Sequence, residues 1–170
     1  MKYSEMLKGE IEQVEQEKIE ILAKIRKCGG YGSPASLKYI SKMNELFDKR
    51  IDLELKLSVE QNRELDVGDG CTYYLWSDSY ACTVIKKTKK TITIQRDKAT
   101  LSPDFKPEWV PGGFAAHCTN AEDQSYTYER NPNGEIYVCH WSEKEGRYRS
   151  GSDGSIKIGV GRHEYYDYNF

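Results

Sequence analysis

The first third of the chain alternates apolar and charged residues with the period of a helix. Apolar side chains recur at spacings of three, four or seven, as on the contact face of a coiled coil, with Lys18 filling one gap in the series Leu7, Ile11, Val14, Ile21 and Ile25. Gly29-Gly30 ends this helix, because glycine adopts the left-handed conformation of a helix C-terminus. Ser33-Pro34 begins a second helix with a serine N-cap and a proline in the first turn. The pattern predicts a helical hairpin whose second helix ends near residue 62.

The second helix carries more apolar surface than one partner helix covers. One stripe contains Leu37, Ile40, Phe47 and Ile51, and a second stripe, offset around the axis, contains Met43, Leu46, Leu53 and Leu57. We therefore expect the hairpin to assemble the protein into a homo-oligomer. The alternative, in which the helix packs on the rest of its own chain, remains open from the sequence.

The remainder of the chain has the period-two alternation of β-strands. Six short runs show it, at residues 71–76, 81–87, 91–98, 125–130, 135–141 and 155–160. Asn131-Pro132-Asn133-Gly134 is a hairpin turn, because proline presets the first turn angle and Asn-Gly tolerates positive φ. The expected fold class is α+β, with a helical hairpin for oligomerisation at residues 1–66. A small antiparallel β-sheet or partly open barrel that binds ligand follows at residues 67–170.

One connection in the β half is too long and too aromatic for a simple turn. Residues 101–119 contain three prolines and the pair Gly112-Gly113. Long loops in compact domains usually carry function, so this segment is expected to belong to a site.

Composition narrows the class of protein. The chain has 25 basic and 27 acidic residues and a net charge of -2, which excludes a surface that neutralises polymeric nucleic acid along its length. No run approaches the ~20 apolar residues of a membrane span, and residues 1–28 lack an apolar signal region, so a cytoplasmic protein without a membrane partner is expected. The five cysteines are widely spaced and are expected to be reduced.

Catalytic chemistry is weakly represented, and no catalytic residue, metal ligand or cofactor is expected. His117-Cys118 and Cys139-His140 resemble a metal set, but neighbours on a strand point to opposite faces, so only one residue of each pair could face a common ion. Cys118 and Cys139 are expected to be buried as small apolar residues.

Binding chemistry is better represented. Arg96, Lys98 and Arg162 lie in sequence beside runs rich in aromatic residues, at 76–80 and 165–170. A nucleotide needs guanidinium groups for its phosphates and a ring face for its base. The alternative is that Arg96 and Lys98 are solvated strand residues and the terminal aromatics belong to the core.

Several stretches of the β half resemble a known family. TITIQRDKA at 91–99, DFKPEW at 104–109, GGFAAHCTN at 112–120 and GRHEYYDYNF at 161–170 are similar to the first-described class of phage Thoeris anti-defence proteins. The resemblance implies a sponge that binds and sequesters cyclic ADP-ribose isomers made by bacterial TIR-domain enzymes, without cleaving them, in the cytoplasm of the infected bacterial host. It further implies that some members hold cyclic trinucleotides, and that the protein is a hexamer built from dimers through N-terminal helices.

The resemblance also assigns roles to individual residues. Arg96 and Arg162 match positions where pyrophosphate-binding arginines are expected, and the loop at 105–120 would close over the ligand. Phe114 or Trp76 would stack on the base, while Asn120 and Asp97 would contact ribose hydroxyls. The full set of expected ligand-binding residues is Trp76, Arg96, Asp97, Lys98, Phe105, Phe114, Asn120 and Arg162.

Two other classes of function remain open from the sequence. One is a small phage nuclease or phosphodiesterase that degrades a nucleotide signal, with His117 or His163 as general acid or base. The other is a protein-binding inhibitor that blocks a host defence complex through an aromatic surface. The sequence does not specify the nucleotide isomer, the host or the exact number of subunits.

Overall fold

The computed structural model describes residues 2–112, 115–152 and 154–169 of the 170-residue chain. It contains two compact units, which meet in sequence between Gln61 and Asn62. The first unit is helical and the second consists mainly of antiparallel strands, which confirms the expected α+β class. Among the described residues, no helix is both long enough and apolar enough to cross a bilayer.

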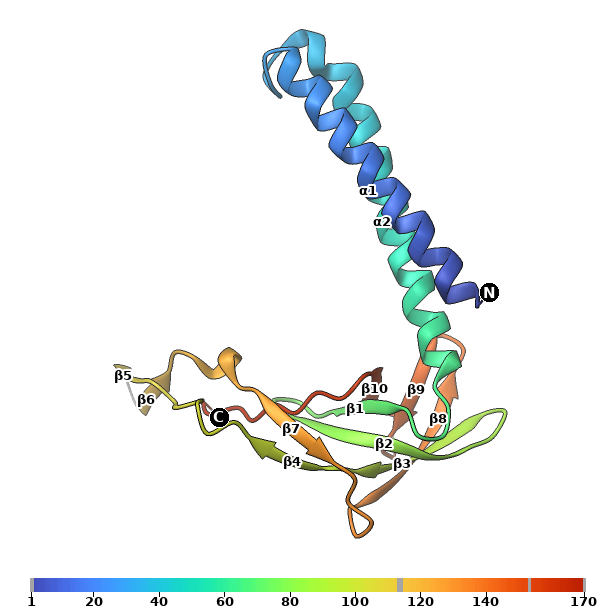
Figure 1. Cartoon of the computed structure of the whole chain (residues 1–170), viewed down its shortest axis with the longest axis vertical. Helices are drawn as coiled ribbons and strands as arrows, with labels where there is room; N and C mark the ends of the chain where they lie inside the picture. The colour runs from blue at the N-terminus through green and yellow to red at the C-terminus, as the bar shows by residue number, and fades with distance from the viewer. Residues whose placement is uncertain (1, 113–114, 153, 170) are drawn as a thin grey trace. The chain divides into compact units, whose positions relative to one another are not determined.

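The first unit is the predicted helical hairpin, with α1 at Tyr3–Lys27, a short 3₁₀ turn η1 at Pro34–Ser36 and most of α2, which spans Leu37–Glu64 and so ends just past the unit boundary (Figure 1). Gly29 and Gly30 follow α1 with φ of 91° and 87°, the left-handed conformation expected at a helix end. The Ser33 hydroxyl accepts a hydrogen bond from the Ala35 amide, as an N-cap does. The two helices bury one shared seam, formed by Leu7, Val14, Leu46 and Leu53.

The apolar stripe of α2 that contains Leu37, Phe47 and Ile51 is left exposed within the helical unit. Leu37, Phe47 and Ile51 have exposed fractions of 64%, 54% and 43%, whereas Leu46 and Leu53 are buried against α1. The pattern therefore divides as the sequence indicated, with one stripe covered by the partner helix and one available. Burial of the exposed stripe by another subunit remains a prediction.

Replacing the exposed stripe should reduce the size of the assembly. The double variant Phe47→Glu/Ile51→Glu places two charges where a subunit contact would otherwise exclude water, while the Leu46–Leu53 seam stays intact. Light scattering at micromolar concentration should show an oligomer for the parent and for Lys49→Glu, an exposed polar control, and a smaller species for the double variant. A monomeric parent would contradict the expectation.

The second unit is built on a closed six-stranded antiparallel barrel. Its strands are β1 (Gly70–Tyr74), β2 (Ser79–Lys87), β3 (Thr91–Arg96), β8 (Ile136–Ser142), β9 (Arg147–Ser150) and β10 (Ile156–Val160). They close in the order β1-β10-β9-β8-β3-β2. Two ribbons accompany the barrel: β4 (Lys98–Leu101) pairs with β7 (Tyr126–Glu129), and β5 (Trp109–Gly112) pairs with β6 (Ala115–Cys118) (Figure 1).

The structure corrects several strand assignments. The run at 91–98 is two strands, because the chain leaves the barrel at Asp97, and the run at 125–130 forms β7, outside the barrel. The sixth barrel strand is instead β9, whose sequence RYRS offers only Tyr148 as an apolar signal. The segment at 101–119 is not a plain loop, since it contains β5 and β6 and leads into a 3₁₀ turn, η2, at Ala121–Asp123.

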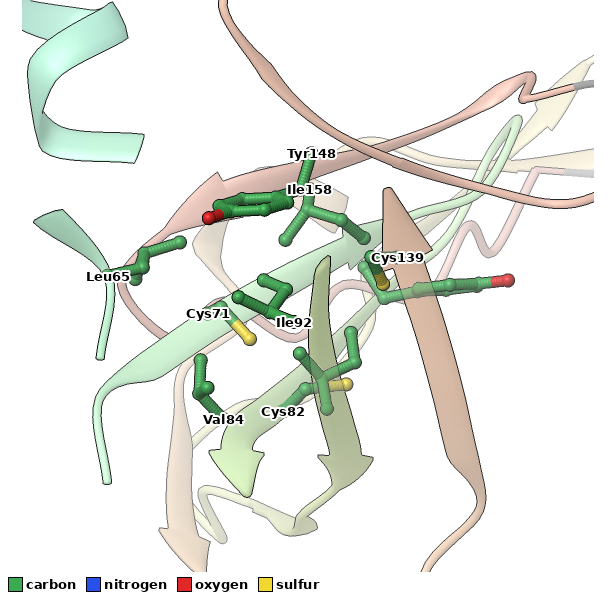
Figure 2. Close-up of a cluster of buried hydrophobic side chains, with 10 residues drawn as sticks. Leu65, Cys71, Cys82, Val84, Ile92, Cys139, Tyr148 and Ile158 are labelled. Carbon is green, nitrogen blue, oxygen red and sulfur yellow. The ribbon is translucent and has the colours of Figure 1, made fainter. Parts of the chain in front are cut away.

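Alternating residues of the barrel strands fill its interior (Figure 2). Figure 2 shows the Cys71, Cys82 and Cys139 side chains among the buried apolar residues Val84, Ile92 and Ile158. All five cysteines are free thiols and four of them are buried, including Cys118 and Cys139 as expected. Burial raises the pKa of Cys82 to about 12 and that of Cys139 to about 11.

These buried thiols predict a loss of stability in mild alkali. A thiol in the unfolded chain ionises near pH ~8.5, whereas the folded barrel keeps Cys82 and Cys139 protonated to higher pH. The unfolded state therefore binds fewer protons above this pH, and the free energy of unfolding should fall by about 1.4 kcal/mol per thiol by pH ~9.5. Urea denaturation should show this decline, and it should be smaller in Cys139→Ala. Constant stability from pH ~8 to ~9.5 would contradict it.

Candidate functional site

Two of the expected ligand-binding residues meet where β3 leaves the barrel. Arg96 is the last residue of β3 and pairs with Cys82 of β2, and Arg162 follows the end of β10 by two residues. Arg162 contacts Thr83 of β2, and Arg96 contacts Glu164, whose carboxylate accepts the Ala81 amide of β2. The structure therefore brings residues 96–97 together with residues 162–164, although they are far apart in sequence.

Arg162 is anchored by a buried carboxylate. Its Nε lies 2.7 Å from Asp97 Oδ2, and its Nη2 donates to Thr83 Oγ1 at 2.8 Å. The Thr83 hydroxyl in turn donates to the Asp97 carboxylate, at 2.7 and 2.8 Å from its two oxygens. The Asp97 side chain is 1% exposed and the Arg162 side chain is 31% exposed. Asp97 thus orients Arg162, with both of its oxygens in use, and is not directed at a ribose.

A glycine makes room for this arginine. A Cβ atom built on Gly70 would lie 2.7 Å from Arg162 Cγ, closer than real Cβ contacts allow. Any larger residue at position 70 would displace the arginine from its place beside β1 and Asp97.

Arg96 is held by an aromatic ring and a second carboxylate. Its guanidinium carbon lies 3.6 Å from the Tyr80 ring centroid, and its Nη2 lies 3.3 Å from Glu164 Oε1. The other oxygen of Glu164 accepts the Ala81 amide at 2.7 Å, while the Ala81 carbonyl accepts the Asp97 amide. The Glu164 carboxylate therefore accepts the Ala81 amide in place of a backbone carbonyl of a neighbouring strand, at the point where the chain leaves β3.

The two guanidinium groups point to opposite faces of the sheet. Arg96 pairs with Cys82, a residue of the barrel core, so its side chain lies on the interior face at the rim. Thr83 is the next residue and points outward, where Arg162 binds it. Arg96–Glu164 and Arg162–Asp97 are two ion pairs, linked through the Ala81 amide and carbonyl, and we call them together the arginine network. The arrangement does not bring the two guanidinium groups together.

Aromatic rings accompany Arg96 on the interior face of the rim. Tyr73 pairs with Tyr80 across β1 and β2, and the Tyr73 and Tyr137 rings stack with centroids 4.2 Å apart. Tyr137 also donates a hydrogen bond to the Glu135 carboxylate, and burial raises the pKa of its hydroxyl. These tyrosines were missed as candidates. The alternation of Tyr80 with Cys82 and Val84 along β2 was the signal that could have found them.

Two further expected residues hold the segment between β4 and η2. Asn120 accepts the Glu108 amide at 2.8 Å and donates to the Lys106 carbonyl at 3.0 Å, so its side-chain amide fixes this segment. Phe105 packs near Tyr168, with ring centroids 5.9 Å apart. Phe105 and Asn120 line a cavity of about 500 Å³, whose other lining residues include Asp104, Glu108 and Asp123.

The remaining expected residues lie apart from the arginine network. Lys98 is exposed and lies 3.6 Å from Glu129 on the neighbouring strand β7. Trp76, in the β1–β2 turn, is fully exposed and lines two cavities, neither of which is lined by Arg96 or Arg162. Phe114 falls outside the described residues.

The histidines considered for catalysis occupy ordinary environments. His117 is exposed while its neighbour Cys118 is buried, as strand alternation requires, and no group of metal-ligating residues occurs in the described part of the chain. His163 Nδ1 lies 2.9 Å from the Ser79 hydroxyl, the geometry of a nucleophile and its base. Ser79 is 3% exposed and forms a β-bridge with Tyr165, and Ser79 and His163 both line a cavity beside the β1–β2 turn.

Comparisons of this chain with protein-family models, with curated proteins and with solved structures find no match. The case for a function therefore rests on the residues themselves.

Removing the Asp97 carboxylate should destabilise the β unit. Asp97→Ala leaves the Thr83 hydroxyl, which is fully buried, without its acceptor and removes the partner of Arg162. A buried donor left unpaired costs about 1–3 kcal/mol, so the variant should unfold at lower denaturant concentration. Asp104→Ala, at an exposed position, serves as the matched control and should unfold like the parent. Equal stability of the two variants would show that the network contributes nothing.

Proposed function

We propose that this protein binds and sequesters a cyclic ADP-ribose-type nucleotide without cleaving it, and thereby blocks Thoeris immunity in a phage-infected bacterium. The observation that carries the proposal is the pair of anchored, partly exposed arginines at the rim of the barrel, Arg96 and Arg162. Their positions are those at which the family resemblance expects phosphate contacts.

A bound phosphate could take the place of a carboxylate that now pairs with an arginine of the network. Glu164 neutralises Arg96 across 3.3 Å, longer than the 2.7 Å contact between Arg162 and Asp97. A phosphate oxygen binds a guanidinium more strongly than a neutral acceptor does, and the Arg96 and Arg162 side chains are 35% and 31% exposed. Arg96, on the interior face of the rim, is therefore the anchor that we assign to a phosphate. Arg162, held by Asp97 on the outer face, contacts the same ligand only where that ligand extends over the rim.

A flat base has a partner beside Arg96. Tyr80 lies under Arg96 and is partly exposed, whereas Tyr73, on the same face, is 6% exposed and stacked on Tyr137, so Tyr80 is the ring that we assign to the base. Base stacking on an aromatic ring contributes about 1–3 kcal/mol per base. The rim thus combines the two chemistries that a cyclic ADP-ribose-type nucleotide requires. Binding of a cyclic trinucleotide by the same protein belongs to the proposal as a wider ligand range.

Sequestration needs tight binding and many copies of the site. The exposed apolar stripe of α2 offers the surface for a homo-oligomer, for which the resemblance implies a hexamer built from dimers. Each subunit of such an assembly would carry its own arginine network.

Removing either arginine should weaken binding. Each charged hydrogen bond to a phosphate contributes on the order of 1.5–3 kcal/mol, so Arg96→Ala should reduce the affinity for a cyclic ADP-ribose isomer roughly ten- to a hundredfold by isothermal titration. Arg96→Lys should recover only part, because an ammonium cannot grip two oxygens in one plane.

The second arginine needs a compensated variant. Arg162→Ala alone leaves the buried Asp97 carboxylate unpaired, so we expect Arg162→Ala/Asp97→Asn to lose affinity while retaining the fold. Arg130→Ala, at an exposed arginine after β7, is the control and should bind like the parent. Parent-like affinity in both network variants would contradict the proposal.

The fate of the ligand separates the candidate functions. After incubation and heat denaturation, a sponge releases the intact nucleotide. A nuclease or phosphodiesterase releases product, and an inhibitor that acts on a host protein releases no nucleotide. Turnover beyond one equivalent per subunit would overturn sequestration.

A further inference from the structure

A small cavity beside the β1–β2 turn has the lining of a cation site. It measures about 270 Å³ and its walls include four aromatic rings and two carboxylates: Tyr74, Trp76, His163, Tyr165, Asp78 and Glu122. Neither lysine nor arginine lines it. We propose that this cavity binds a guanidinium group, either free or at the end of an arginine side chain.

The volume and the charge select this class of ligand. The cavity lies at or below the lower end of the range for drug-sized ligands, which is about 300–1,000 Å³, so it suits one small group better than a whole nucleotide. Phosphates would meet two carboxylates there. A planar cation instead stacks on aromatic faces and donates to carboxylate oxygens, and guanidinium does both.

The aromatic walls are held out from the core by specific contacts. A Cβ atom on Gly159 would lie 2.7 Å from Tyr74 Cε2, so the glycine lets the tyrosine ring lie across β10. The Leu75 amide donates to the Asp78 carbonyl and closes the turn that presents Trp76. Trp76 is fully exposed, the most exposed of the large apolar residues in the described structure. A tryptophan displayed in this way is typical of a residue that anchors a contact.

The acidic walls are fixed in place as well. Asp78 Oδ1 accepts the Asp167 amide at 2.8 Å, which ties the turn to the C-terminal segment. The Tyr165 hydroxyl donates to Glu122 Oε1 at 3.4 Å, and Gln124, next to η2, donates to the Tyr166 carbonyl and accepts the Tyr166 amide. Burial and the nearby carboxylates of Glu122 and Asp167 raise the pKa of Tyr165, in agreement with a negative potential at this wall.

Binding can be followed at Trp76 in the full-length protein. With 5-fluorotryptophan in place of tryptophan, ¹⁹F NMR reports the three tryptophans separately, and Trp76→Phe assigns the signal. Nα-acetylarginine methylamide should shift the Trp76 signal saturably at millimolar concentration. The neutral isostere Nα-acetylcitrulline methylamide should bind at least tenfold more weakly.

Variants of the walls complete the test. Glu122→Gln should weaken binding of the arginine probe several-fold. Trp109→Phe, a change at an exposed aromatic residue of β5, should leave the titration of the Trp76 signal unchanged. Methylguanidinium distinguishes the sources: equal binding indicates a free guanidinium ligand, and binding of the arginine probe alone indicates an arginine side chain of a polypeptide. Equal shifts with the citrulline probe, or no saturation by any guanidinium, would overturn the site.

Discussion

The β unit depends on the buried carboxylate of Asp97. With its side chain 1% exposed, this group is costly unless it is paired, and Thr83 and Arg162 supply the hydrogen bonds and the charge. Asp97 is also the residue at which the chain leaves β3 for β4. One ion pair therefore fixes the exit of a strand and the start of the C-terminal segment.

The C-terminal segment follows this anchor across the outside of the barrel. Gly161 donates to the Gly70 carbonyl and accepts the Thr72 hydroxyl, and Tyr165 forms a β-bridge with Ser79. Asn169 then holds β6 through both backbone groups of Cys118. Because the segment binds β1, β2 and β6 in turn, it places Glu164 beside Arg96 and Tyr165 beside Glu122. The arginine network and the cavity at Trp76 thus share one structural origin.

The sequence predicted the regular parts of the fold. Helical periodicity located both helices, because α1 buries its seam against α2 alone, and period-two alternation located five of the six barrel strands. It missed β9, where arginines flank the one buried ring, Tyr148. It also missed the point at Asp97 where the chain leaves the barrel for β4, since the period-two alternation of apolar and polar residues continues when a strand changes its pairing partner.

The candidate site was predicted only in part. Arg96 and Arg162 were selected by residue type and by resemblance, and the structure places them in one network. The roles expected for Asp97 and Asn120 differ, because each uses its polar atoms to hold neighbouring chain segments. The hydrogen-bond partners of these two side chains lie 12 residues away for Asn120 and 65 residues away for Asp97, and such long-range contacts are not encoded in the periodicity of the sequence.

Native mass spectrometry of the full-length protein with a panel of cyclic nucleotides tests the central claim most directly, because it reports the number of subunits and the mass of the bound ligand together. The account predicts an oligomer that carries a cyclic ADP-ribose isomer at its intact mass, and loss of that added mass in Arg96→Ala. A protein that retains none of the nucleotides, or that carries a cleaved product, would contradict it.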